Sequence, residues 1–380
     1  MALLKTKPKA FVTIVLFSIY YGAMGQSIPQ YGLSNKLDVA CWNVEWFGST
    51  TNGPSNEILQ FNNILNVLKS TKIDIWALEE VSDVSVFNQL MDSLPNFKGL
   101  VAPIGQTQKT ALLYDTIQFK VLSQNLIITN QYYDFSSGRY PFEVVLSAKN
   151  SNDTLVLIVV HLKANVGTTV EKQESWQRRK NAAKHLKTYL DTYRANDKVI
   201  VLGDFNDDTD TSIFIGNATP FDTLLNDSGY YQFLTKTLSL QKTSSTVGYT
   251  DMIDHQMISN ELFMQYNSAS CKVLRLDSFI SNYSNTTSDH FPVFASYNFS
   301  TITNVFNISN HAASIYPNPL RASDILTFSE KVADFSITDC IGKKYQNSLF
   351  TEVNHLRPKG IFLVQFNKDG VVYSYRLLAE

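Results

Sequence analysis

Short apolar runs alternate along this chain with longer segments in which apolar residues recur every three or four positions. The runs at 37–47 (LDVACWNVEWF) and 73–81 (IDIWALEEV) predict buried strands, because both are rich in β-branched and aromatic residues. The segment between them predicts a helix, since Ile58 and Leu68 bound an apolar pattern of helical period and Ser55 is a suitable N-cap. The pattern therefore predicts a strand, a helix and a second strand in this order.

The same alternation continues to about residue 298. Further strands are predicted at 110–115, 119–129, 140–150, 154–163, 198–205, 251–259 and 291–299. A short helix is predicted at 85–94 and a long one at 170–195. Because some strands follow one another directly and others are separated by helices, the pattern indicates an α/β domain in which helices cover sheets.

The composition changes near residue 300. The α/β pattern occupies residues 34–300, and residues 301–313 are polar and without strong periodicity, as in a linker. From residue 314 to 380, short strands separated by turn residues predict a small all-β module. The chain is thus expected to have two folded parts.

The first 25 residues have the pattern of a secretory signal peptide. Three lysines precede an apolar run, and Ala23 and Gly25 are small residues at the spacing of a cleavage site. An uncleaved anchor is the competing interpretation, but the run is short for a bilayer, so we expect no stable membrane span. The prediction is a secreted protein whose residues 1–25 are removed.

Charge and cysteine content narrow the function classes. The formal net charge of the 380 residues is -2, and signal cleavage removes only lysines, so the chain is not a strongly basic nucleic-acid binder. The three cysteines, Cys41, Cys271 and Cys340, are far apart in sequence. They offer no disulfide framework and no zinc-binding spacing, and buried free thiols are expected.

Several polar residues share one position, at or just past the end of an apolar strand. They are Asn43, Glu80, His161, Asp204, Asn206, Asp254, Asp289 and His290. Oxygen ligands from Asp, Glu and Asn suit a hard cation such as Mg²⁺, and histidines can transfer protons. Each residue alone has an ordinary alternative, such as a turn group, a helix cap, a core histidine or an ion pair. The acids of VLGDFNDD (201–208) raise the same choice between a turn and a metal site.

The motifs WNVEWFG, ALEEV, HLK, GDFND, MIDHQMIS and SDHFPV occur in this order between residues 36 and 298. In order and spacing they resemble the endonuclease/exonuclease/phosphatase superfamily, which includes deoxyribonuclease I. The resemblance implies a four-layer sandwich, with two β-sheets packed face to face, helices outside and a catalytic cleft at one edge.

The resemblance also implies a metal site and a phosphate site. Glu80 resembles the principal metal-binding carboxylate, with Asn43 and Asp289 in the same site. Asp204 and Asn206 resemble the pair that orients the attacking water and holds the phosphate. The implied cofactor is Mg²⁺, with Mn²⁺ and Ca²⁺ as alternatives.

Three further residues complete the implied site. His290, paired with Asp254, is similar to the family histidine that contacts the scissile phosphate or transfers a proton. His161 corresponds to a second histidine of the deoxyribonuclease branch, a proton donor to the leaving oxygen, although no carboxylate partner for it is evident in the sequence. Arg139 in GRYPF resembles an arginine that approaches a substrate phosphate. Glu79 departs from the family, which more often has Gln there.

These residues favour a secreted, metal-dependent phosphodiesterase that acts on DNA or RNA and is expected to be a monomer. The helix at 170–195 carries basic residues that could contact a phosphate backbone, although such a face is usually only solvated. These residues are Arg178, Arg179, Lys180, Lys184 and Lys187. A phospholipid or small phosphoester substrate is the second hypothesis, with the loop at 128–140 (Tyr132, Tyr133 and Phe135) as a membrane contact. A non-catalytic surface binding protein is the third.

The C-terminal module has a resemblance of its own. YPNP (316–319), the turn at 342–344 and RPKGIFLVQF (357–366) resemble the sorting domain of type IX secretion in Bacteroidetes. This implies passage through the periplasm, a partner in the type IX secretion machinery, and release or attachment at the cell surface. An accessory β-sandwich that binds a ligand is the alternative.

Overall fold

The computed structural model describes residues 27–298 except Ser34 and Asn152, and residues 315–380 with gaps at 330–331, 333–334, 340–342, 353–357 and 369–370. The predicted signal peptide at 1–25 and the predicted linker at 301–313 lie outside the described residues. The chain divides into two compact units between Ile302 and Thr303.

The larger unit contains two mixed six-stranded sheets. The first has the order β11 (Lys272–Val273), β12 (Val293–Tyr297), β1 (Leu37–Phe47), β2 (Ile75–Val81), β4 (Lys109–Asp115), β3 (Phe97–Val101). The second has the order β5 (Phe119–Leu126), β6 (Phe142–Ala148), β7 (Thr154–His161), β8 (Val199–Asp204), β10 (Asp254–Ser259), β9 (Tyr231–Phe233). In each sheet one central pair is parallel, β1 with β2 and β7 with β8, and the other neighbours are antiparallel.

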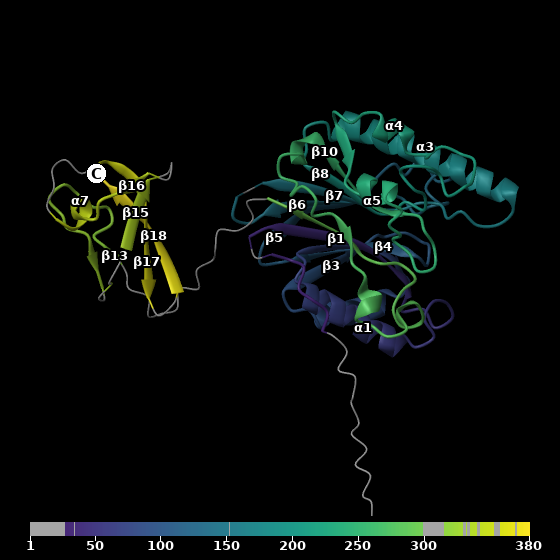
Figure 1. The fold of residues 1–380 in the computed structure, drawn as a ribbon, viewed down its shortest axis with the longest axis horizontal. Coiled ribbons are helices and arrows are strands. Elements are labelled where there is room, and N and C mark those ends of the chain that lie inside the picture. Colours follow the sequence, from purple (N-terminus) through teal and green to yellow (C-terminus); the bar gives the residue numbers. More distant parts are fainter. Residues whose placement is uncertain are drawn as a thin grey trace, which may run out of the picture. The chain divides into compact units, whose positions relative to one another are not determined.

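The two sheets pack face to face, and helices cover their outer faces (Figure 1). Between the sheets, side chains such as Val39, Leu157 and Leu202 are fully buried in one apolar cluster. Helices α1 (Glu57–Thr71) and α2 (Val84–Asp92) cover the first sheet, and α3 (Thr169–Tyr193) and α4 (Asp222–Leu225) cover the second. The predicted four-layer sandwich is confirmed.

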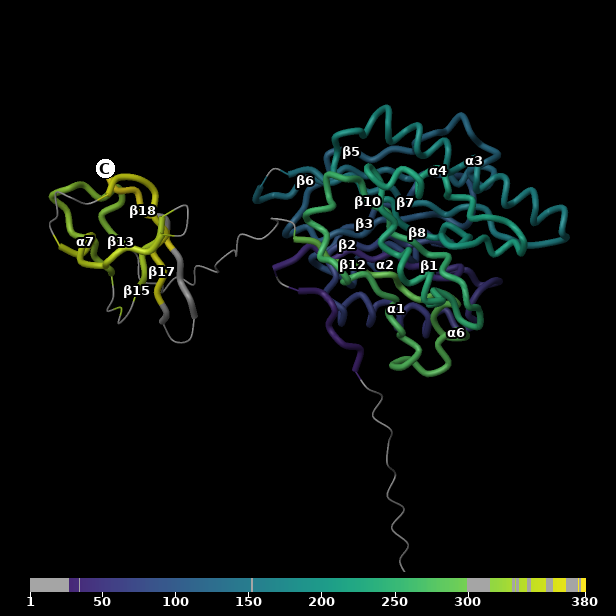
Figure 2. Tube along the Cα trace, turned by 45° about the horizontal axis from the view of Figure 1, so that its top comes forward, coloured from purple at the N-terminus to yellow at the C-terminus, as the bar shows by residue number. Residues whose placement is uncertain are grey.

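Short helical turns complete this unit. They are α5 (Lys236–Leu240), α6 (Tyr283–Thr286) and two 3-10 turns at Asn260–Leu262 and Leu276–Ser278. The tube view shows the long α3 lying along the second sheet and α1 along the first (Figure 2).

Local signals explain where the long helices begin. Thr168 caps α3 together with Glu171 in a capping box, in which each side chain bonds the other residue's main-chain nitrogen. For α1 the expected cap, Ser55, was wrong by one position. Asn56 is the N-cap, because its side-chain oxygen accepts a bond from the Leu59 nitrogen at 2.9 Å.

The C-terminal unit is an antiparallel β module with its own apolar core. A four-stranded sheet has the order β16 (Lys344–Tyr345), β15 (Phe335–Asp339), β17 (Gly360–Lys368), β18 (Val371–Ala379). A second pair joins β13 (Ile315–Tyr316) to β14 (Thr327–Phe328), and α7 (Ser348–Thr351) is a single turn. Buried Leu320, Ile337, Val364 and Leu377 form the core. In the part of the chain that is described, no helix has the length and apolarity to cross a membrane.

Asp74 precedes β2, at the end of that strand remote from Glu80. Its carboxylate accepts hydrogen bonds from the main-chain nitrogen of Asp38 (2.9 Å) and from the side-chain amide of Gln118. Burial raises the pKa of Asp74 to about 7. The folded chain therefore keeps a proton on Asp74 that the unfolded chain releases above roughly pH 4.

Asp74→Asn should stabilise the protein at alkaline pH. Since the folded state binds the extra proton, the stability of the wild type falls as the pH rises from about 4 to 7, and an uncharged side chain removes this loss. We expect the free energy of unfolding of the variant to exceed that of the wild type by about 1–2 kcal/mol at pH 8 and to match it near pH 4. Urea unfolding at both pH values measures this difference, and a variant less stable than the wild type at pH 8 would contradict it.

Candidate active site

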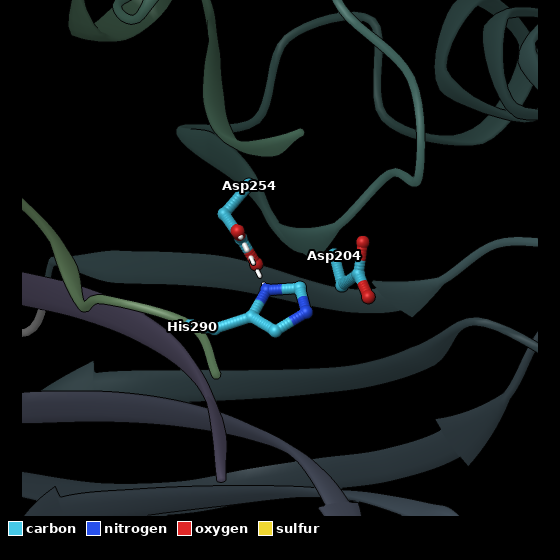
Figure 3. Close-up of side chains that lie close together, drawn as sticks. All are labelled: Asp204, Asp254 and His290. Carbon is cyan, nitrogen blue, oxygen red and sulfur yellow. Dashed lines mark hydrogen bonds and ion pairs between the residues drawn. The ribbon is translucent and has the colours of Figure 1, made fainter. Parts of the chain in front are cut away.

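Polar side chains from both sheets gather at one end of the sandwich. Asn43 lies in β1, Glu80 near the end of β2, His161 and Asp204 at the ends of β7 and β8, and Asp254 at the start of β10. His290 lies three residues before β12. Figure 3 shows Asp204, Asp254 and His290 facing one another. One ligand atom from each of these three lies within 4.8 Å of the others.

Asn43 connects the two sheets at this site. Its side-chain nitrogen donates to Oε1 of Glu80 and to Oδ2 of Asp204, both at 3.1 Å. Glu80 belongs to the first sheet and Asp204 to the second, so these bonds fix the separation of two carboxylates that are distant in sequence. The main-chain nitrogen of Trp46 donates to the other oxygen of Glu80 at 3.1 Å.

The backbone around these residues is irregular. The register between β1 and β2 shifts between Asn43 and Phe47, and Glu80 has a positive φ of 62°. A non-glycine residue in this region costs free energy and persists where surrounding contacts impose it. Here the bonds to both oxygens of Glu80 hold the strained residue with its carboxylate in the site.

His290 and Asp254 form a buried pair. Nδ1 of His290 lies 2.8 Å from Oδ2 of Asp254, and the His290 carbonyl accepts bonds from Trp42 (3.0 Å) and the Tyr283 hydroxyl (2.6 Å). Burial opposes the charge on His290, but the Asp254 carboxylate outweighs it and raises the pKa of the imidazole well above its usual value. The pairing implied by the sequence resemblance is present, and the nearest carboxylate oxygen recorded for Nε2 of the ring is Oδ1 of Asp289 at 3.9 Å.

His161 has two carboxylates beside it, which the sequence did not reveal. Its Nε2 lies 3.5 Å from Oδ2 of Asp204 and 3.8 Å from Oε1 of Glu80. Burial, with help from the charge of Arg139, lowers the pKa of His161 well below its usual value. The imidazole is therefore neutral in the free chain at neutral pH.

Arg139 and Asn206 meet at one carbonyl group. Nη2 of Arg139 and the side-chain nitrogen of Asn206 both donate to the Leu162 carbonyl, at 3.0 and 3.1 Å. Nη1 of Arg139 donates to Gln108 at 2.9 Å, and its buried Nε has no hydrogen-bond partner among the described residues. The main-chain nitrogen of Asn206 donates to Asp204 at 2.8 Å. The structure thus places both predicted phosphate-binding residues beside Asp204.

The acids of VLGDFNDD do not act as one group. Asp204 lies in the site, but Asp207 pairs with Arg179 at 2.8 Å, and Asp208 accepts bonds from the Ser239 hydroxyl and the Met252 nitrogen. The last two acids therefore do not belong to a metal site, because each has partners within the protein. Only the first acid of the stretch faces the site.

Residues 40–290 match the Endonuclease/Exonuclease/phosphatase family. The chain belongs to this family. The fold is shared with an endonuclease/exonuclease/phosphatase protein of Bacteroides vulgatus (15% identity, 69% of this chain and 98% of that chain, TM-score 0.50). It is also similar to D. rerio TDP2 complexed with a single-strand DNA product (14% identity, 70% and 99%, TM-score 0.50). The human Nocturnin catalytic domain matches with 19% identity over 70% and 95% of the chains, at a TM-score of 0.49. No curated protein matches this chain.

This endonuclease/exonuclease/phosphatase protein is a phosphoester hydrolase whose buried Asp and His side chains suit a metal ion. Burial and the nearby Asp254 raise the pKa of Asp204 to about 7, and the buried Oδ1 of Asp254 has no partner within the described residues. Carboxylates crowded in this way repel one another, and a cation relieves the repulsion. The donors are mainly oxygen atoms, which a hard divalent cation prefers.

Glu45 is a site residue that the sequence interpretation missed. Its carboxylate accepts a bond from the Asp289 nitrogen at 2.9 Å, and burial, followed by the charge of Asp289, raises the pKa of Glu45 to about 7. The signal was available, because Glu45 lies two residues after Asn43 in WNVEWFG. The Asp289 side chain itself is 55% exposed and lies 3.9 Å from Nε2 of His290.

Proposed function

We propose that this protein is a divalent-metal-dependent nuclease that hydrolyses phosphodiester bonds of DNA or RNA. The observation that carries the proposal is the position of Arg139, a buried cation whose free Nε and neighbouring Asn206 lie beside the acid cluster. Burial lowers the pKa of this guanidinium, the charges of Asp204 and Glu80 act against that effect, and a bound phosphate anion would do so further. D. rerio TDP2, which shares the fold, was solved with a single-strand DNA product, and we extend this substrate class to the present chain.

The proposed reaction is attack of water on the phosphorus. A metal ion bound by Glu80, Asn43 and Asp289 would neutralise the phosphate and stabilise the developing charge. Asp204 would orient the water and accept its proton, and Asn206 would hold the phosphate. The His290 imidazolium, kept charged by Asp254, would donate to a phosphate oxygen. His161, neutral in the free chain, would donate a proton to the leaving oxygen once the phosphate raises its pKa.

A panel of phosphoesters tests this assignment. We expect plasmid DNA, RNA and bis(p-nitrophenyl) phosphate to be hydrolysed with Mg²⁺ or Mn²⁺, and sphingomyelin vesicles and sugar phosphates to be poor substrates. The measurement is the initial rate for each compound at equal phosphoester concentration, with EDTA as the blank. Faster release of headgroup from vesicles, or of phosphate from a monoester, would contradict the nuclease assignment. It would favour a phospholipid or small phosphoester as the substrate.

The loop at 128–140 does not present the expected apolar surface for a membrane. Tyr132 and Tyr133 are 57% and 53% exposed, but Phe135 is 1% exposed and packs in the core beside α3. The Tyr133 hydroxyl donates to Glu174, and the Arg178 guanidinium lies 4.1 Å from the centre of its ring. The prediction for Phe135 was wrong because the turn directs its ring inward, which weakens the phospholipid hypothesis.

We further propose that the protein is exported through the periplasm and released or attached at the cell surface. The support is the signal-peptide pattern at 1–25 and the resemblance of the C-terminal module to a type IX sorting domain. That module also has a core of its own, as a separable sorting unit requires. Mass spectrometry of the protein recovered from culture fluid and cell surface should find no residue before Gln26; an intact N-terminus retained in the cytoplasm would contradict export.

A further inference from the structure

A cavity of about 600 Å³ opens on the side of the sandwich and is separate from the active site. It lies beside the edge strands of both sheets, because Phe233 belongs to β9 and Cys271 directly precedes β11. β9 pairs with the end of β10 that is remote from Asp254. None of the active-site residues described above lines this cavity, which we call the side cavity.

The wall of the side cavity is the lateral edge of the core between the two sheets. Leu234 and Cys271 belong to that core, and Leu238 and Tyr266 pack against it. Apolar side chains that border an open space lose the contacts that close packing would give them. An apolar ligand would restore these contacts and would remove apolar surface from water.

Cys271 shows what kind of ligand group the wall accepts. Its thiol is free and buried, and burial alone raises its pKa to about 12, so the thiol is uncharged at neutral pH. The main-chain nitrogen of Cys271 donates to the Tyr266 hydroxyl at 3.3 Å, which satisfies both groups within the protein. The inner part of the side cavity therefore suits an uncharged, apolar chain.

The mouth of the side cavity carries positive charge without a neighbouring acid. Lys236, the first residue of α5, lines the cavity and is exposed. None of the ion pairs found among the described residues involves its ammonium group. No aspartate or glutamate of the described part of the chain lines the cavity, and the exposed Gln232 and Gln241 add only neutral amides. This charge complements a ligand with an anionic end.

We propose that the side cavity binds a fatty acid, with its alkyl chain between the edges of the two sheets and its carboxylate beside Lys236. The volume lies within the range of cavities that hold small ligands, roughly 300–1,000 Å³. Such cavities are lined mainly by apolar side chains, with a few polar groups that orient the ligand. The apolar wall and the single cation at the mouth fit a molecule with one long apolar part and one negative charge. This site is independent of the proposed nuclease function.

The first test measures binding by calorimetry, in EDTA so that no insoluble metal salt of the fatty acid forms. Decanoate and dodecanoate are titrated into the wild type, and we expect the dissociation constant to fall about fifteenfold for the two added methylene groups. Decanoate should bind Lys236→Gln about three- to fivefold more weakly than the wild type, whereas decanol should bind both equally. Lys242→Gln is the control, because Lys242 is paired with Asp210 and does not line the cavity.

The second test locates the ligand through the thiol at the wall. Alkylation of Cys271 by iodoacetamide is followed by mass spectrometry of the peptide that contains it. At ten times its dissociation constant dodecanoate leaves about a tenth of the sites empty, so alkylation of Cys271 should slow about tenfold. Cys41 is fully buried in the same core and should stay unmodified with and without dodecanoate, which shows that the fold remains closed.

Three outcomes would overturn the proposal. The first is that decanoate and dodecanoate give no binding heat, and the second is that they bind without slowing the alkylation of Cys271. The third is that Lys236→Gln binds decanoate as tightly as the wild type, or that Lys242→Gln weakens binding by the same factor. Because both tests measure binding, a protein that hydrolyses no phosphodiester would refute the proposed function and leave this result unaffected.

Discussion

Replacing His290 with glutamine is expected to lower kcat for phosphodiester hydrolysis by about a thousandfold, within the range of general acid–base groups. Glutamine has a similar length and can still reach Asp254, but it carries no positive charge. The loss should therefore appear in kcat rather than in KM. Initial rates with bis(p-nitrophenyl) phosphate and plasmid DNA measure the effect.

His185 supplies a control for this experiment. It forms a histidine–aspartate pair with Asp134, with Nε2 and Oδ2 at 3.2 Å, on the outer helix α3. His185→Gln makes the same chemical change away from the site and should leave kcat within about twofold of the wild type. If His290→Gln kept more than a tenth of the activity while remaining folded, the His290–Asp254 pair would have no part in catalysis.

Asp204→Asn should abolish activity and yet stabilise the metal-free protein. In the folded chain the pKa of Asp204 is raised to about 7 by burial and by Asp254, so ionising it above that pH costs folding free energy. Asparagine removes that cost, and we expect the free energy of unfolding in EDTA at pH 8 to rise by about 2 kcal/mol. The same change removes the carboxylate that orients the water, so turnover should fall by at least about a hundredfold.

Added metal should make the wild type more stable than the Asp204→Asn variant. Mg²⁺ or Mn²⁺ binds the folded wild type and raises its melting temperature by mass action, whereas EDTA removes both this shift and the activity. The shift should be smaller in Asp204→Asn, because Asp204 shares the Asn43 amide with the proposed metal ligand Glu80 and its charge acts on the same ion. Asp222→Asn, at a more exposed acid paired with Lys180, is the control and should follow the wild type. An equal metal-induced shift in Asp204→Asn, or a wild type active in EDTA, would contradict a metal site that depends on this acid cluster.

The loss of activity and the gain of stability expected for Asp204→Asn have one physical cause, the crowding of buried acids at the site. Glu79, beside Glu80, is fully buried, and neither of its carboxylate oxygens has a partner within the described residues. Burial, followed by the charge of Asp254, raises the pKa of Glu79 well above its usual value. The folded protein therefore tolerates a surplus of acids near its site by protonating some of them, and it gives up stability to keep the others available for a cation.

Much of the active site could be predicted from the sequence, because the placement of polar residues at strand ends depends on order along the chain. The position of Glu80 at the end of one apolar run and of Asp204 at the end of another follows from strand periodicity, which needs no knowledge of the fold. The motif order indicated the family and its four layers. The pairing of His290 with Asp254, thirty-six residues earlier, followed only from the resemblance, since nothing local joins them.

The sequence by itself determined which residues end a strand and which side chains carry charge or ligand atoms. Only the tertiary structure decided which of these meet: that His161 lies beside the carboxylates of Asp204 and Glu80, and that Asp207 is paired with Arg179. The reason is physical. Periodicity along a chain reports which face of an element is buried, whereas the distance between side chains of two different sheets is set by how the sheets pack.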